Sequence, residues 1–264
     1  MDYFYHYTSV ESLALILKNR TFRLNNLADM DDLEEGHTTD MGRFGRCIYV
    51  SSWTDDSRES IPLWAMYTPN MQGVRIKMKK KIFEAETLKK DGKNVKEDIT
   101  YAKGLINVQK ENNIIILPPF IGDFIKVEYT DEESKLHPSI VEMLSPSEFN
   151  ISLKDIGKYK RSSWYFQKEW RYRIKTIPFT HEQLQEMQLK QIDLEKYDLI
   201  LNALRDEGVK ALKYLDLGIA NDAFADMEIL CGPKITAGQK IIVEDLVEKY
   251  NPAAKILQSE LKIR

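Results

Sequence analysis

Cysteine is scarce in this chain of 264 residues, and long apolar runs are missing. The two cysteines, Cys47 and Cys231, lie far apart in apolar segments, which indicates buried free thiols and a reducing compartment. The apolar runs fall well short of the roughly 20 residues that a membrane helix requires. The chain starts with an acidic residue and several tyrosines, so no secretory signal is expected. We therefore expect a cytoplasmic protein without a membrane partner.

Several common kinds of site are also missing from the sequence. The four histidines share no ligand spacing with one another or with a cysteine, so no metal site is predicted. The stretch CGPKITAG has glycines but lacks the strand–loop–helix lysine pattern of a phosphate loop. There is no nucleophile elbow, although a dispersed Ser/His/Asp triad stays open. The formal net charge of −3 gives no overall reason to expect nucleic acid.

What remains is the composition of an ordinary globular protein, 43% hydrophobic and 30% charged. Short alternating segments predict strands, and amphipathic segments between them predict helices. No repeat or linker divides the sequence, so we predict one α+β domain over residues 1–264, with more antiparallel than parallel strands and flanking helices. The other expected features are a charged helical excursion over 80–113, a surface excursion over 131–150, and helices over 152–166, from Thr180 and over 195–206.

Polar and aromatic residues gather at the ends of several predicted elements. Two of them end the first strand, two lie in the strand CIYVSSWT, and two lie one turn apart in the short helix IPLWAMY. They are His6, Thr8, Ser51, Ser52, Trp64 and Tyr67. Each type also has a structural explanation: a core histidine bonded to backbone, a strand terminus, or two rings of the hydrophobic core. The arrangement indicates chemistry only if the chain supplies partners.

The stretch WYFQKEWRYRI supplies such partners. In a strand, Gln167, Glu169 and Arg171 lie on one face, because side chains alternate with a period of two. An amide and a carboxylate two residues apart then form a compact polar group at a sheet surface. The structural alternative is an exposed strand face on which a glutamate and an arginine pair.

The order of several motifs resembles that of a known family. These motifs are YHYTS, SSWT, PLWAMY, QKEWRYR, ILCGPKIT and KYNPAAKI. They resemble an uncharacterised bacterial family with a histidine–tyrosine–threonine start, a W-x-x-Y segment and an E-x-E-x-R strand. That family in turn resembles an outlying branch of the ADP-ribosyltransferase superfamily. Two features depart from its pattern: the acidic loop over 30–34 lacks the usual asparagine and proline, and Gln167 replaces the first glutamate.

The resemblance implies a split, mostly antiparallel sheet and NAD as co-substrate, without a metal. Breaking the bond between nicotinamide and ribose builds positive charge on the sugar, as glycoside cleavage does. A fixed carboxylate stabilises that charge and holds the 2′-hydroxyl, and the resemblance gives this role to Glu169. It gives His6 a hydrogen bond donated to the ribose that carries adenine.

Further cofactor-binding assignments follow from the same resemblance. Thr8 is expected to contact backbone near the nicotinamide, unless it is only the end of its strand. Ser51 and Ser52 are expected to brace the core and orient the catalytic glutamate. Tyr67 is expected to stack on the nicotinamide ring, with Trp64 beside it. A hydrophobic-core role for both rings stays open.

Two residues near the predicted catalytic glutamate carry open interpretations. Arg171 pairs either with the pyrophosphate of NAD or with Glu169, and we favour the structural pair. Gln167 occupies the position that, in the superfamily, helps to select the acceptor. A neutral amide both donates and accepts hydrogen bonds, which suits an amide or a nucleobase better than an arginine.

We therefore expect an NAD-dependent mono-ADP-ribosyltransferase acting on RNA, DNA or protein, as a bacterial toxin or phage-defence effector with an antitoxin as candidate partner. Two alternatives stay open: an NAD glycohydrolase, and a nucleotide-binding sensor or interaction module without catalysis. The strip over 158–168, where Lys158, Lys160, Arg161 and Lys168 interleave with aromatic residues, is a candidate RNA contact. Its structural alternative is a solvated helix face.

Overall fold

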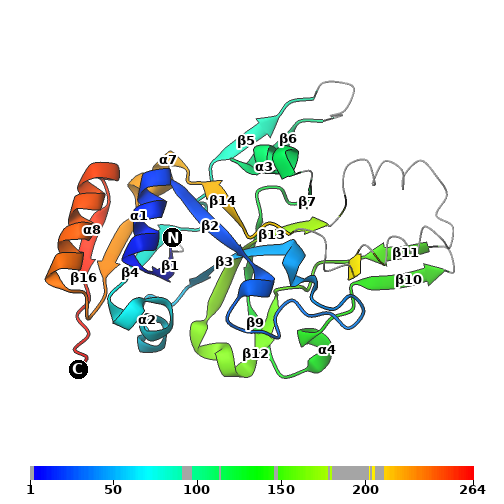
Figure 1. Cartoon of the computed structure of the whole chain (residues 1–264), viewed down its shortest axis with the longest axis horizontal. Coiled ribbons are helices and arrows are strands. Elements are labelled where there is room, and N and C mark those ends of the chain that lie inside the picture. The colour runs from blue at the N-terminus through cyan, green and yellow to red at the C-terminus, as the bar shows by residue number, and fades with distance from the viewer. Residues whose placement is uncertain are drawn as a thin grey trace.

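One large sheet with helices packed against it organises the computed structural model (Figure 1). The structure describes residues 3–90, 97–112, 114–145, 148–177, 179, 202, 204–205 and 211–264. The sheet has ten strands and is mostly antiparallel, which confirms the predicted α+β class. Its strands are β1 (Tyr3–Thr8), β2 (Thr21–Asn26), β3 (Ile48–Thr54), β4 (Val74–Lys79), β7 (Ile115–Leu117), β8 (Asp123–Lys126), β13 (Glu169–Ile177), β14 (Tyr214–Gly218), β15 (Glu228–Cys231) and β16 (Lys255–Gln258).

Helices and short ribbons make up the rest of the described secondary structure. The helices are α1 (Val10–Asn19), α2 (Ile61–Tyr67), α3 (Leu105–Asn112), α4 (Glu133–Leu136), α7 (Asn221–Ala225) and α8 (Ala237–Tyr250). Short 3-10 segments are η1 (Leu27–Asp29), η2 (Phe44–Cys47), η3 (Pro69–Met71) and η4 (Ser162–Gln167). The two-stranded ribbons pair β5 (Ala85–Leu88) with β6 (Ile99–Ala102), β9 (Glu128–Thr130) with β12 (Tyr159–Arg161), and β10 (Val141–Ser145) with β11 (Glu148–Ile151).

The sheet is divided along one edge of β3. β13 pairs with the other edge of β3 over most of its length. On the divided edge, β1 meets β3 only at Thr54, and β2 meets it only at residues 49–50. Residues 51–53 therefore have no strand partner on that edge among the described residues. β1 leads away to β4, β15 and β16, and β2 leads away to β14.

The local sequence explains the β1–α1–β2 unit that crosses this division. The Ser9 hydroxyl accepts the backbone N–H of Ser12 at 3.1 Å and so caps α1. The helix ends at Asn19, and the left-handed φ of 55° at the C-cap residue Arg20 turns the chain directly into β2. The buried residues of α1 recur at helical spacing; they are Val10, Leu13, Ile16 and Leu17.

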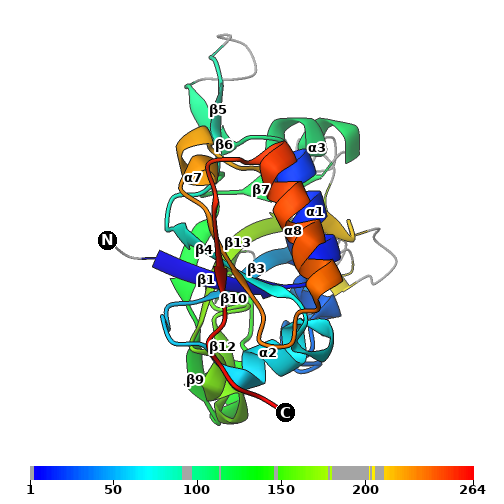
Figure 2. The ribbon, with the colours of Figure 1, turned by 90° about the vertical axis from the view of Figure 1, so that its left-hand side faces the viewer.

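The main core lies between the large sheet and the helices α1 and α8, which run side by side on one face (Figure 2). Buried residues of α8, Val243 and Val247, join those of α1 and of the central strands in one apolar cluster. The hydroxyl of Thr236 caps α8 by accepting the Gln239 N–H at 3.2 Å. No helix among the described residues is long and apolar enough to span a membrane.

Two peripheral segments differ from expectation. The segment 80–113 contains the hairpin β5–β6 before α3, so helix accounts for only part of its described residues. The segment 131–150 includes α4 and the ribbon β10–β11, but its Leu136 and Ile140 are buried. The polar residues and prolines of this segment predicted a surface position. In the structure, Ile140 instead belongs to a second buried apolar cluster.

A further difference concerns residues 152–166, where turns, β12 and η4 replace the expected helix. Gly157 has a φ of +72°, which breaks a right-handed helix, and residues 159–161 pair with β9 instead. The helices expected from Thr180 and over 195–206 lie outside the described residues, apart from 202, 204 and 205.

Candidate functional site

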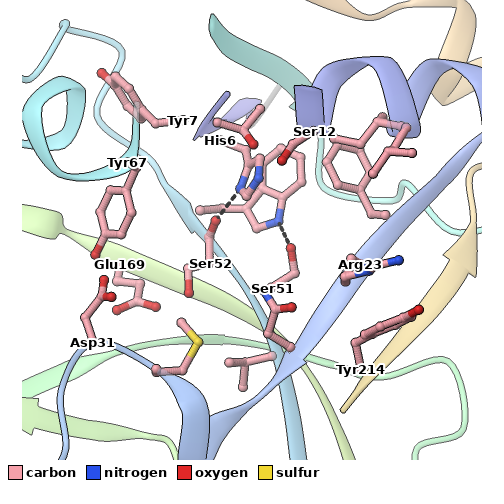
Figure 3. Close-up of a pocket in the computed structure, with 18 of the residues that line it drawn as sticks. His6, Tyr7, Ser12, Arg23, Asp31, Ser51, Ser52, Tyr67, Glu169 and Tyr214 are labelled. Atoms are coloured by element: carbon pink, nitrogen blue, oxygen red, sulfur yellow. Dashed lines mark hydrogen bonds between the residues drawn. The ribbon is translucent and has the colours of Figure 1, made fainter. Parts of the chain in front are cut away.

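A pocket of about 600 Å³ opens where β1 and β2 separate from β3 (Figure 3). Its lining comes from β1, α1, β2, β3, α2, η4, β13, β14, and from η1 with the loop after it. Most of the residues expected at a site line this pocket; they are His6, Thr8, Ser51, Ser52, Tyr67, Gln167 and Glu169. Residues up to 163 positions apart in sequence are therefore brought to one concave surface.

Glu169 belongs to a buried network of four charged side chains. Arg171 binds both of its oxygens, with Nε 2.6 Å from Oε1 and Nη2 3.0 Å from Oε2. Lys160 Nζ lies 3.2 Å from the same Oε2 and 3.4 Å from Glu35. Glu35 in turn pairs with Arg171 at 2.6 Å. Two carboxylates and two cations thus balance, each with a side chain less than a twentieth exposed, so no charge is buried without a partner.

This network determines the charge state of Glu169 and how many of its hydrogen-bond acceptor positions remain unused. Burial opposes its charged form, but attraction to Arg171 and Lys160 outweighs burial and lowers the pKa to about 2. Glu169 is therefore a carboxylate at neutral pH. A carboxylate offers about four lone-pair positions, and the network occupies three of them. The fourth position faces the Ser52 hydroxyl, which helps to lower the pKa of Glu169, or a hydroxyl group of a ligand.

Close backbone packing holds the loop that carries Glu35. Gly36 has a φ of +76°, and a Cβ at this position would lie 2.5 Å from the Cα of Gly45. The Gly45 N–H also donates to the Gly36 carbonyl oxygen at 2.7 Å. On the other side, Arg171 Nη1 donates to the carbonyl oxygen of Gly157 at 3.1 Å. Loop and turn therefore fix the network from both sides.

Gln167 reaches the site by a different route from the one predicted. It is the last residue of η4, and Lys168 has a left-handed φ of 44°, so the strand begins only at Glu169. Gln167 therefore does not share a strand face with Glu169. Its Oε1 accepts from Lys160 at 2.9 Å, and its Nε2 donates to the Tyr67 hydroxyl at 2.5 Å. The turn brings the amide beside Glu169 through these partners.

Tyr67 and Asp31 form the outer part of this end of the pocket (Figure 3). Burial, with the charges of Asp31 and Glu169, raises the pKa of Tyr67. The hydroxyl stays protonated, and because its oxygen already accepts from Gln167, its proton is free to point toward Asp31. Neither Asp29 nor Asp31 has a cationic partner within the described part of the chain. This end of the pocket therefore carries surplus negative charge.

His6 is a hydrogen-bond acceptor toward the pocket. Its Nδ1 lies 2.8 Å from the carbonyl oxygen of Ser52, which can only accept, so Nδ1 carries the hydrogen. Burial lowers the pKa of His6 and favours the neutral ring, whose Nε2 then presents a lone pair. A neutral ring in this tautomer offers an acceptor, whereas the sequence prediction required a donor. Trp53 and Phe22 pack against the ring, at 5.1 and 5.7 Å between centroids.

The serines of β3 lie where the strand lacks a neighbour. The Ser51 hydroxyl accepts the indole N–H of Trp53 at 3.1 Å. The Ser52 hydroxyl faces Glu169 and helps to lower its pKa, although its buried Oγ makes no hydrogen bond of ordinary geometry among the described residues. Thr8, 8% exposed at the end of β1, also lines the pocket.

Two expected cofactor-binding residues do not line the pocket. Trp64 is fully buried, packs edge-on against Tyr7 at 4.8 Å, and donates from Nε1 to Glu59 at 3.0 Å. This is the position that the hydrophobic-core alternative describes. Arg171 is also fully buried and is committed to two carboxylates, so it cannot reach a pyrophosphate.

The basic strip over 158–168 presents no unpaired cation. Lys160 is buried in the network around Glu169. The other three cations bind carboxylates: Lys158 with Glu128 at 3.1 Å, Arg161 with Glu34 at 2.5 Å, and Lys168 with Asp56 at 2.6 Å. The strip is a short strand and a 3-10 segment, not a helix face.

Part of the chain is similar to known protein sequences. Residues 63–172 match the family model described as "Protein of unknown function (DUF2971)". The chain is 32% identical over 78 residues to the uncharacterized protein ORF111 of Acidianus two-tailed virus. The matched region is 28% of this chain and 68% of the viral protein. The chain belongs to the same uncharacterised family as this viral protein. The DUF2971 match includes Tyr67, Gln167 and Glu169, but not His6. No solved structure matches the chain at a significant level.

Proposed function

We propose that this protein is an NAD-dependent mono-ADP-ribosyltransferase that modifies a macromolecule. The observation that carries the proposal is the convergence of His6, Ser52, Tyr67 and Glu169 on one pocket from four separate segments. These residue types match the chemistry of cleavage at a ribose: a fixed carboxylate, an acceptor for a sugar hydroxyl, and an aromatic ring. The toxin or defence setting stays a prediction from the motifs.

In this proposal the nicotinamide ribose lies beside Glu169. The bond between C1′ and the ring nitrogen breaks, and its electron pair leaves with neutral nicotinamide. A lone pair of the acceptor atom forms the new bond to C1′, and the proton of that atom passes to solvent water. Glu169 stabilises the positive charge that develops on the sugar, and Arg171 and Lys160 hold it so that little reorganisation is required.

The charge at this end of the pocket suits the substrate. The nicotinamide ring of NAD is cationic before cleavage, and Asp29 and Asp31 add negative charge to the lining. The Tyr67 ring offers a surface for stacking. Gln167 has spent one donor and one acceptor on Tyr67 and Lys160, so by the inventory of an amide one of each remains for an acceptor group.

The test is nicotinamide release from NAD by the purified protein, with and without RNA, DNA or cell extract. We expect Glu169→Gln to slow release by about 10²–10³-fold. Glu228→Gln is the matched control, because it removes a strand carboxylate that binds Lys77 at 3.3 Å outside the pocket. Thermal unfolding of both variants shows whether they are folded.

Each result has a defined meaning. Release that depends on Glu169 and rises with a labelled macromolecule supports the transferase. Release that depends on Glu169 and labels nothing indicates an NAD glycohydrolase instead. NAD binding without release indicates a sensor. Equal release by wild type and by folded Glu169→Gln contradicts the role of the carboxylate.

A further inference from the structure

The end of the pocket opposite Glu169 contains a stacked arginine and tyrosine. In Figure 3, Arg23 and Tyr214 lie on the other side of His6 from Tyr67 and Glu169. The guanidinium carbon of Arg23 is 3.4 Å from the Tyr214 ring centroid. No motif in the sequence indicates either residue.

Strand register builds this stack. Arg23 on β2 lies directly opposite Asp216 on β14, and Asn25 lies opposite Tyr214. The guanidinium donates from Nε and Nη2 to the two oxygens of Asp216, at 2.9 Å each. Phe22, the neighbour of Arg23 on β2, is buried on the opposite face. The arginine plane is therefore held in place by two paired strands.

The stack keeps an open surface for a ligand. One face of the guanidinium covers the tyrosine ring, while 41% of the Arg23 side chain remains exposed. Arginine planes and aromatic rings are the surfaces on which nucleobases stack. Asn25 also lines this end, and its side chain has no hydrogen-bond partner among the described residues. An asparagine amide is suited to the N6 and N7 edge of adenine.

We propose that the Arg23–Tyr214 stack binds the adenine of a nucleotide, with Asn25 reading the base edge. That the nucleotide is NAD, with its nicotinamide half at Glu169, rests on the proposed function. The binding of adenine does not, because it requires no chemistry. His6 then lies between the two halves, where its Nε2 can accept a ribose hydroxyl.

Titration calorimetry with AMP and with nicotinamide mononucleotide tests this assignment. Arg23→Lys keeps the positive charge but removes the plane, so we expect AMP to bind at least about fivefold more weakly, the lower bound for a lost base stack. The affinity of Arg23→Lys for nicotinamide mononucleotide should differ from that of wild type by less than about twofold. Arg20→Lys is the matched control, because Arg20 covers Phe224 at 4.6 Å and bonds Asn221 outside the pocket.

A second substitution separates stacking from charge. Tyr214→Ala removes the ring that supports the Arg23 guanidinium, and it should lower the affinity for AMP as much as Arg23→Lys does. Tyr214→Phe keeps the ring and should bind AMP with wild-type affinity. The proposal is overturned if AMP does not bind the wild-type protein, or if Arg23→Lys binds AMP with wild-type affinity. It is also overturned if Arg23→Lys weakens the binding of nicotinamide mononucleotide as much as that of AMP. Failure of nicotinamide release with AMP binding intact would remove the proposed function and leave this site standing.

Discussion

Each end of the pocket has an arginine that donates two hydrogen bonds to a carboxylate, but the two pairs differ in their burial. At one end Arg171 holds Glu169 in a fully buried network. At the other, Arg23 holds Asp216 with side chains 41% and 33% exposed. Water screens the second pair but not the first. Breaking the buried pair should therefore cost much stability. The exposed pair orients the guanidinium surface and contributes little to stability.

The largest effect is expected where a buried charge loses its partners. Arg171→Met leaves Glu169 and Glu35 buried with one cation between them, and should lower the free energy of unfolding by about 3–5 kcal/mol. Arg23→Met, the matched change at the other end, should cost about 0–1 kcal/mol. Urea unfolding of both variants measures the difference. Similar losses would show that the two pairs are energetically alike.

A smaller effect is expected in the loop behind the buried network. Gly36→Ala forces a Cβ to 2.5 Å from the Cα of Gly45 at a φ of +76°, and strain of this kind costs about 1–3 kcal/mol. Gly42→Ala is its control, since Gly42 has a φ of +63° with nothing within 4 Å of a Cβ. Thermal melts should show the larger loss for Gly36→Ala. Equal losses would mean that the close approach to Gly45 does not hold the loop.

Acid should weaken the buried end. The folded pKa of Glu169 is about 2, below its ordinary value of 4.5, so unfolding takes up a proton in this range. The stabilisation is complete above pH 4.5 and is lost as the pH falls toward about 2. Urea midpoints measured across this range should fall less steeply for Glu169→Gln than for wild type. Parallel curves would show that this carboxylate is not the group responsible.

The smallest effect is expected from Asp216→Asn. The exposed pair with Arg23 is screened by water, so stability should change by less than about 1 kcal/mol. The guanidinium should nevertheless lose its fixed orientation, and AMP affinity should fall although the melting temperature does not. A large loss of stability would instead place this pair with the buried network and end the contrast between the two ends.

Local patterns predicted the elements that carry most of the pocket. Alternation identified β1, an apolar run identified β3, and the stretch WYFQKEWRYRI identified β13. His6 and Ser52 lie within β1 and β3, and Glu169 is the first residue of β13. The pattern was less informative about Gln167, because a left-handed residue at Lys168 interrupts what looks like continuous strand.

The sequence by itself determined the α+β class, the order of strands and helices around the pocket, and the residues at their ends, because periodicity and caps act over a few neighbours. Tertiary structure alone decided that Glu35 and Lys160 balance Glu169 and Arg171, and that Arg23 stacks on Tyr214. These contacts join segments more than 100 residues apart, or follow from turns without a pattern. Their physical origin is strand register and the requirement that buried charges be paired, neither of which a local stretch of sequence records.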